Sequence, residues 1–169
     1  GFWDLLRGLP TTAAADGYFY DLGSGSGRAV FCARFWGDYQ ECIGVELLPN
    51  LHQLAVSVAS LYKFQYQHKL HPDCQKVKFV CSDLLQYEPW FRHPPTDAVT
   101  IYIPNLLFDV TLTHQIAIQA LPLSSGTHLI CLKPFTNIVP EWKDAFALIQ
   151  QKLVPMSWGE STVYVYRKQ

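Results

Sequence analysis

The chain has 169 residues, of which 49% are hydrophobic, and its 13 basic and 14 acidic residues give a formal net charge of −1. This length and apolar fraction predict one domain with a buried core and exclude a wholly disordered chain. The balanced charge disfavours a free-standing nucleic-acid-binding domain, and no run of residues approaches the ~18 apolar residues that a membrane span needs. The start of the chain does not predict a signal peptide, because it lacks a basic segment followed by an apolar one.

In chain order, the first half predicts strands that alternate with helices. Residues 18–22 (YFYDL) predict a short strand that ends near an acid, and residues 28–36 predict a helix after the loop GSGSG. Residues 41–46 (ECIGVE) predict a second strand. Apolar residues at helical spacing then predict a long helix from Leu51 to Leu70, opened by the Pro49-Asn50 pair.

The second half continues this alternation. Residues 77–81 predict a third strand, and residues 97–103 (DAVTIYI) predict a fourth that is hydrophobic enough to be a central strand buried on both faces. The remaining predicted elements are a helix from His114 to Leu121, a strand over 127–132, a helix from Glu141 to Leu153, and a last strand in the tail STVYVYRK, antiparallel and at or near the sheet edge.

Strands that alternate with helices predict an open, doubly wound α/β sheet. In such sheets a ligand binds beyond the carboxyl ends of the strands, at the point where the strand order reverses. The candidate binding residues therefore directly follow the predicted strands. They are Asp21 to Gly27, Glu46, Asp83, Asn105 and Lys133.

The loop after the first strand, DLGSGSG, is the strongest of these candidates. Its glycines, Gly23, Gly25 and Gly27, permit a close approach of a ligand to the backbone, although a tight strand-to-helix turn alone would also explain them. Arg28 stands where a dinucleotide-binding loop has its third glycine, and the Asp21 carboxylate would repel a pyrophosphate. The loop therefore favours a ligand that carries an ammonium group.

Two further acids follow the next two strands. Glu46 can accept both hydrogen bonds from a ribose diol, with a solvated strand-end acid as the alternative interpretation. Asp83 can accept a hydrogen bond from an adenine amino group, and Leu84 can cover the ring, whereas an aspartate at this place alone more often caps a helix. These side chains suit the ribose and the base of an adenosine group.

The cysteines and histidines do not predict a metal site. Four of the five cysteines have apolar neighbours and are expected to be small core residues in a reducing compartment: Cys32, Cys42, Cys81 and Cys131. His68 and His71 lie close to Cys74, but Pro72 interrupts any shared helical face, so a metal there is the weaker interpretation.

Acid-x-Gly-x-Gly-x-Gly, GVE and CSD at successive strand ends resemble the class I S-adenosylmethionine-dependent methyltransferases. A narrower resemblance is to the Dot-one (disruptor of telomeric silencing) family of non-SET histone lysine methyltransferases. It rests on DLGSGSGRAVF, ECIGVE, IPNLLF, LKPF and MSWGESTVYVY, in that order. Asn105 and Phe108 match the family's element after strand four, Trp158 and Tyr164 match its late aromatic residues, and Pro104 replaces its first asparagine.

This resemblance implies a fold and a cofactor. The fold is the Rossmann-like α/β fold of class I methyltransferases, a seven-stranded, mainly parallel sheet with helices on both faces and an antiparallel C-terminal strand. The cofactor is S-adenosyl-L-methionine, with S-adenosyl-L-homocysteine as the product and no metal. Residues 1–169 are then a single methyltransferase domain, the catalytic core of a longer protein. The cofactor-binding residues implied are Asp21, Gly23, Ser24, Gly25, Gly27, Glu46, Asp83, Leu84 and Asn105.

The resemblance further implies methyl transfer to a protein lysine, foremost a histone lysine. Asn105 would orient the amine or the methionine end of the cofactor. Phe108, Trp158 and Tyr164 would line an apolar channel that lowers the pKa of the lysine amine and holds the methylated product by cation–π attraction. Packing alone would also explain Trp158 and Tyr164.

The partners implied are a histone or another protein, with the nucleosome as a candidate, and neither a nucleic-acid site nor a membrane contact is expected in this chain. The expected location is the nucleus, with the cytoplasm as the alternative. Two other functions stay open. One is a class I methyltransferase that acts on a non-histone protein, an RNA or a small molecule, and the other is an inactive relative that only holds the cofactor.

Overall fold

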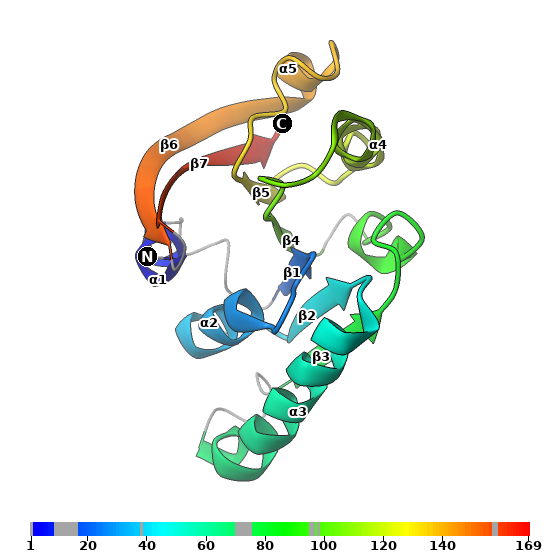
Figure 1. Cartoon of the computed structure of the whole chain (residues 1–169). Coiled ribbons are helices and arrows are strands. Elements are labelled where there is room, and N and C mark those ends of the chain that lie inside the picture. The colour runs from blue at the N-terminus through cyan, green and yellow to red at the C-terminus, as the bar shows by residue number, and fades with distance from the viewer. Residues whose placement is uncertain are drawn as a thin grey trace.

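The computed structural model describes residues 2–8, 17–37, 39–69, 76–94, 97, 99–156 and 159–169. Within these residues one mixed sheet has the strand order β3-β2-β1-β4-β5-β7-β6 (Figure 1). Its strands are β1 (Tyr18–Leu22), β2 (Glu41–Glu46), β3 (Lys76–Cys81), β4 (Val99–Ile103), β5 (His128–Cys131), β6 (Phe146–Met156) and β7 (Gly159–Lys168).

The sheet is mainly parallel, as the alternating pattern predicted. β1 pairs in parallel with β2 on one side and with β4 on the other, so the strand order reverses at β1. β7 is antiparallel to both β5 and β6. β4 is buried along its whole length and is the middle strand of the seven, which confirms the prediction for the most hydrophobic segment.

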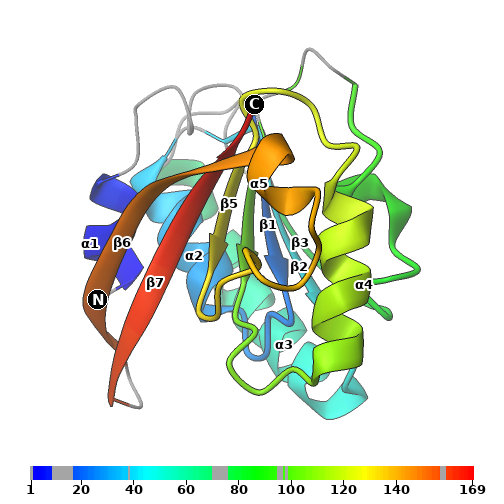
Figure 2. The same cartoon turned by 90° about the horizontal axis from the view of Figure 1, so that it is seen from above.

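Helices cover both faces of the sheet (Figure 2). One face carries α1 (Phe2–Arg7), α2 (Arg28–Trp36) and α3 (Pro49–Gln65), and the rings of Phe31 and Tyr62 join the last two at a centroid distance of 5.6 Å. The other face carries α4 (Val110–Ala120) and α5 (Trp142–Ala145). None of the helices in the described ranges is long and apolar enough to cross a membrane.

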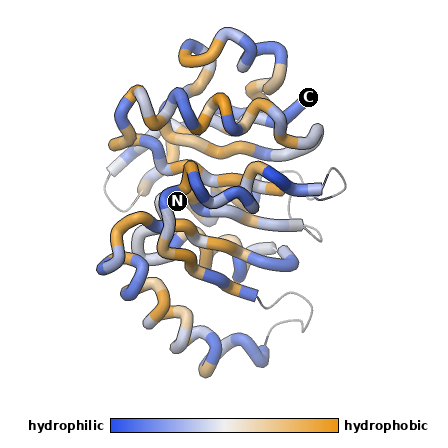
Figure 3. The backbone as a smooth tube through the Cα atoms, turned by 90° about the vertical axis from the view of Figure 1, so that its right-hand side faces the viewer, coloured by the Kyte–Doolittle hydropathy of each residue, from blue (hydrophilic) through white to orange (hydrophobic). Residues whose placement is uncertain are grey.

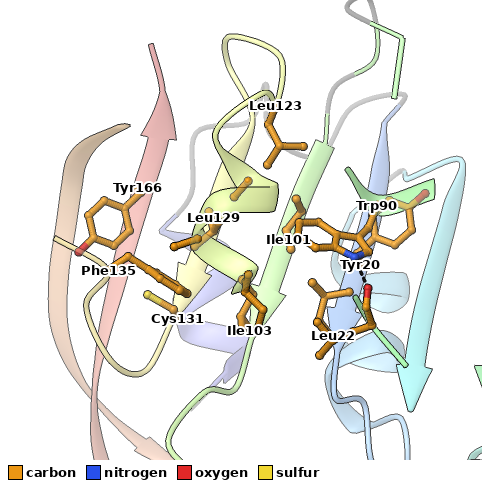
Figure 4. Close-up of a cluster of buried hydrophobic side chains, with 14 of the residues drawn as sticks. Tyr20, Leu22, Trp90, Ile101, Ile103, Leu123, Leu129, Cys131, Phe135 and Tyr166 are labelled. Atoms are coloured by element: carbon orange, nitrogen blue, oxygen red, sulfur yellow. Dashed lines mark hydrogen bonds between the residues drawn. The ribbon is translucent and has the colours of Figure 1, made fainter. Parts of the chain in front are cut away.

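A hydrophobic cluster fills each face. Apolar stretches run through the strands in the middle of the sheet (Figure 3). The cluster under α4 and α5 includes the buried rings of Trp90, Phe135 and Tyr166 (Figure 4). The cluster under α1 and α2 includes Leu5 and Val30. These two clusters pack the strands together, and the strand ends in turn position the loops at the carboxyl edge.

The prediction of a helix from Glu141 to Leu153 is wrong. The helix ends at Ala145, and the chain continues as β6, which pairs with β7 from Phe146 to Met156. The apolar side chains of this segment follow a helical spacing, but the hydrogen bonds to β7 override that local preference. Pro155 fits because β6 is an edge strand that pairs only with β7 among the described residues.

Smaller differences concern element ends and one cysteine. The long helix α3 ends at Gln65, five residues earlier than predicted, and a 3-10 turn at Gln67–Lys69 follows it. The helix α4 begins at Val110, four residues earlier than predicted, because the Asp109 side chain accepts a hydrogen bond from the Leu112 N–H at 2.7 Å.

Cys42 and Cys131 are buried and Cys32 is half-buried, whereas Cys81 is exposed and not a core residue.

Candidate functional site

The glycine loop connects β1 to α2 at the carboxyl edge of the sheet. Gly23, Gly25 and Gly27 all have positive φ angles, of 98°, 53° and 85°. The backbone N–H groups of Gly23 and Ser24 both donate to the Val45 carbonyl, at 2.8 and 3.1 Å, which fastens the loop to β2. A Cβ atom built at Gly25 would meet no atom within 4 Å, so this glycine faces open space.

A cavity of about 440 Å³ lies against this loop. Its volume is within the range of about 300–1,000 Å³ that is usual for small-molecule sites. It is lined by Phe2, Asp21, Gly23, Ser24, Gly25, Ser26, Arg28, Ala29, Cys32, Tyr102, Pro104, Pro155 and Met156. The structure therefore brings Asp21 together with Gly23, Ser24 and Gly25 of the loop around one cavity, whereas Gly27 and Glu46 do not line it. That these residues bind a cofactor stays a prediction.

Asp21 is the buried acid of this cavity. Its side chain is 2% exposed, and its Oδ1 atom has no hydrogen-bond partner among the described residues. Burial, and secondly repulsion from the Glu46 carboxylate, raise the pKa of Asp21 to about 8. A buried carboxyl group without a partner is costly, and a cationic ligand would relieve that cost. The cavity therefore suits an ammonium group at Asp21.

Glu46 fastens the glycine loop from the end of β2. Its Oε2 atom accepts a hydrogen bond from the Gly25 N–H at 2.7 Å, and its Oε1 atom accepts one from the Leu48 N–H at 2.8 Å. Each carboxylate oxygen can accept a second hydrogen bond. Glu46 does not line the cavity, so its contact with a ribose diol stays a prediction.

The end of β3 lies next to the end of β2, since the Ser82 N–H donates to the Glu46 carbonyl at 3.0 Å. The Asp83 carboxylate accepts a hydrogen bond from the Leu85 N–H at 2.8 Å, which is a local turn contact. Leu84 is buried in the core, and its carbonyl accepts a hydrogen bond from the Trp90 indole at 2.6 Å. Neither Asp83 nor Leu84 lines the cavity, so their contact with an adenine ring stays a prediction.

Asn105 ties the exit of β4 to the exit of β5. Its side chain is fully buried, and its Oδ1 atom accepts hydrogen bonds from the N–H groups of Leu132 and Lys133 at 2.9 and 2.8 Å. Its Nδ2 atom donates to the Lys133 carbonyl at 3.1 Å. Three positions of the carboxamide are thus bonded to the backbone. The structure therefore gives Asn105 a positioning task in addition to any contact with a ligand.

We expect Asn105→Ala to destabilise the protein and to lower turnover more than cofactor affinity. The substitution removes the acceptor of the Leu132 and Lys133 N–H groups, and for the buried Leu132 N–H this costs about 1–3 kcal/mol. Urea unfolding measures the stability, and steady-state kinetics separate kcat from KM. Normal turnover would remove Asn105 from the mechanism.

Two of the three predicted aromatic residues, Phe108 and Tyr164, do not line the cavity. Phe108 lies beside the glycine loop, because a Cβ atom at Gly23 would be 3.2 Å from its Cζ atom. Tyr164 packs with Phe108 against the cluster under α4 and α5, on the sheet face opposite α1 and α2. Trp158 lies outside the described residues. Lys133 is exposed, and only its backbone takes part in the Asn105 contacts.

Sequence reasoning missed several cavity residues. Tyr102 could have been found, since it is the strand partner of Asp21 in the β1–β4 register, and Arg28 directly follows the last glycine. Phe2 comes from α1, which no motif marks, and Met156 lies at the end of β6, a strand that the sequence analysis did not predict. These residues reach the cavity only through tertiary packing.

The chain is similar to a known protein family and to several solved structures. The family model described as "Histone methylation protein DOT1" matches residues 10–148. A search of the curated proteins finds no match. Among solved structures, yhhF of Escherichia coli, a proposed methyltransferase, is similar with a TM-score of 0.68 and 12% identity, over 99% of this chain and 85% of that chain.

A second similar structure contains a bound cofactor. It is magnesium protoporphyrin IX methyltransferase (ChlM) from Synechocystis PCC 6803 with bound S-adenosylmethionine. Its TM-score is 0.64 at 14% identity, over 99% of this chain and 75% of that chain. Pyrococcus horikoshii TYW2 in complex with MeSAdo is also similar, with a TM-score of 0.62 and 15% identity, over 92% of this chain and 59% of that chain. The fold is therefore the Rossmann-like fold of class I methyltransferases.

Proposed function

The chain belongs to the family of DOT1 histone methylation proteins, and from this premise we propose that it transfers a methyl group from S-adenosylmethionine to a histone lysine, with the nucleosome as the substrate. The observation that carries the proposal is the buried Asp21 carboxyl group at a cavity beside the glycine loop, whose Oδ1 atom has no hydrogen-bond partner among the described residues. We further propose that residues 1–169 act as a single domain in the nucleus, where histones are found.

The residues present fit the cofactor. The Asp21 carboxylate would bind the ammonium group of its amino-acid end, and the glycine loop would follow the chain of that end from Gly23 to Gly25. Arg28 brings a positive charge to the same cavity and suits the carboxylate of that amino-acid end. Glu46 would accept the ribose hydroxyls. When bound, S-adenosylmethionine supplies an electrophilic methyl group on a positively charged sulfur.

The lysine amine would approach from the face opposite the cavity. Phe108 and Tyr164 lie on that face, whereas Asp21 and Tyr102 lie at the cavity. In-line transfer needs the amine and the leaving sulfur on opposite sides of the methyl carbon. A free lysine amine has a pKa of about 10.4, and apolar walls lower this value because they disfavour the charged form. Phe108 and Tyr164 would thereby help to present a neutral amine.

The loops around the site carry exposed apolar side chains, which suit contact with a protein substrate. Leu47 and Leu48 after β2, and Leu107 and Val110 after β4, are exposed apolar side chains at the carboxyl edge. Leu107 is 93% exposed. Exposed apolar side chains that gather around a site mark a surface for another macromolecule. We therefore propose that these side chains contact the protein that carries the lysine.

We expect Leu107→Glu to raise the KM for a protein substrate by about tenfold, because a charge on the contact surface costs roughly 1–2 kcal/mol of binding. The affinity for S-adenosylmethionine should stay unchanged, since Leu107 does not line the cavity. Kinetics with histone and calorimetry with the cofactor measure the two effects. An unchanged KM would remove this loop from the contact surface.

The proposed function is tested with labelled S-adenosylmethionine and four substrates: nucleosomes, free histones, a mixture of non-histone proteins, and RNA. We expect label on a histone lysine, identified by mass spectrometry of the digested product, and none on RNA. Label that appears only on RNA or only on non-histone proteins would contradict the histone proposal and would favour the wider class I alternative. Asp21→Asn serves as the inactive control.

A further inference from the structure

A second groove lies between α3 and β3, away from the cavity. Its floor is apolar and consists of Val56, Ala59 and Tyr62 of α3 with Val77 and Phe79 of β3. Its volume is about 330 Å³. None of these residues belongs to the site described above, so the groove is a separate surface of the molecule.

The groove runs beside an open strand edge. β3 is the terminal strand of the sheet and pairs only with β2 among the described residues (Figure 1). The backbone N–H and C=O groups on its outer side therefore have no strand partner in the described chain. Such an edge is a template on which an extended segment of another protein can add a strand.

The charged residues that line this groove are both lysines, Lys63 and Lys78. Residues 49–81 contain four lysines and one acidic residue, Asp73, although the whole chain has slightly more acids than bases. Lys63 of α3 and Lys78 of β3 line the groove, and neither forms an ion pair within the part of the chain that the structure describes. Lys69, by contrast, lies over the ring of Tyr66 and does not line the groove.

We propose that this groove binds an extended acidic segment of a partner protein. The segment adds a strand along β3, places its apolar side chains on the floor formed with α3, and brings carboxylates to Lys63 and Lys78. The apolar floor and the open strand edge favour a peptide, since neither feature recognises a phosphate backbone. The proposal does not depend on the methyltransferase function, because the groove and the cavity share no residue.

The probe is a fluorescein-labelled peptide of about eight residues, a common strand length, in which glutamate and valine alternate. Fluorescence anisotropy with the whole chain should show saturable binding of this peptide and none of its lysine–valine counterpart. Binding of both peptides, or of neither, would overturn the proposal. Tighter binding of a labelled single-stranded RNA, lost with the same lysine substitutions, would also overturn it and would assign the groove to nucleic acid.

Matched variants test whether peptide binding depends on the groove itself or only on the overall charge of this region. Lys63→Glu and Lys78→Glu should each weaken peptide binding by about tenfold, because attraction becomes repulsion at the groove. Lys69→Glu makes the same charge change on the same part of the molecule but outside the groove, so it should weaken binding by less than about threefold. Ala59→Leu should weaken binding by filling the groove without any change of charge. An equal loss for Lys69→Glu and Lys63→Glu would overturn the proposal, and unchanged cofactor affinity in all variants confirms that they are folded.

Discussion

Gly25→Arg should abolish binding of S-adenosylmethionine while the protein stays folded. Gly25 lines the cavity, and a Cβ atom there meets no other atom within 4 Å, so an arginine side chain would enter open space beside the loop. It would also place a second positive charge in the cavity that is proposed to bind a cation. We expect an affinity loss of more than about a hundredfold by calorimetry, equivalent to roughly 3 kcal/mol.

The matched control for this variant is Gly126→Arg. Gly126 also has a positive φ angle, of 89°, and a Cβ atom there meets nothing within 4 Å, but it lies in the turn before β5 and not at the cavity. Both substitutions therefore carry a similar backbone cost of about 1–2 kcal/mol. The melting temperatures of the two variants should agree, whereas only Gly126→Arg should bind the cofactor. Cofactor binding by Gly25→Arg would exclude the cavity as the site.

Asp21→Asn should reduce cofactor affinity and change the pH dependence of the ligand-free protein. The pKa of Asp21 is raised from its usual value to about 8, so the folded protein holds a proton that the unfolded chain has lost. The contribution of this carboxyl group to the free energy of unfolding is fully present below about pH 4 and is lost as the pH rises through about 8. Asparagine has no such titration, so the variant should be more stable than the natural chain at about pH 9, by a few kcal/mol.

The same carboxyl group predicts the pH dependence of cofactor binding. A protonated Asp21 does not attract a cation, so affinity should rise by about tenfold for each pH unit up to about pH 8. At higher pH it should fall again, because the ammonium group of the ligand loses its proton. The affinity of Asp21→Asn should be low and independent of pH over this range. Calorimetry at several pH values measures both effects. An identical pH profile for the natural chain and for Asp21→Asn would contradict the role of this carboxyl group.

The strands and the glycine loop were predictable because each signal is local. The buried strands β1, β2 and β4 are short apolar runs, and the three glycines stand directly after β1. The site at the carboxyl edge follows from general rules for parallel sheets, so residue order alone is enough to place Asp21 and the loop together. The loop residues with positive φ angles are glycines, the residue type that adopts such angles most readily.

The edge strand β6 could not be predicted from local pattern. Leu148, Ile149 and Leu153 are exposed although they are apolar, so the segment has no alternation of buried and exposed residues. A register shift between Leu148 and Gln150 further breaks the period of two. β6 pairs with β7, the next strand along the chain, so this pairing and not the pattern within β6 decides its structure. The cavity residues Pro155 and Met156 were missed for the same reason.

The hydrogen bonds of Asn105 and Glu46 likewise could be identified only from the tertiary structure. The sequence placed both at strand ends but could not show that the Asn105 carboxamide bonds to the exit of β5, or that the Glu46 carboxylate accepts the Gly25 N–H. These contacts join residues 27 and 21 positions apart along the chain. They make both side chains part of the frame that holds the site.

The central claim is that the cavity beside Asp21 holds S-adenosylmethionine. It is tested most directly by calorimetric titration of the chain with S-adenosylmethionine and, separately, with NAD at about pH 8. We predict saturable one-to-one binding of S-adenosylmethionine and no binding of NAD, because the buried Asp21 carboxylate attracts an ammonium group and repels a pyrophosphate. Binding of NAD, or no binding of S-adenosylmethionine, would contradict the account.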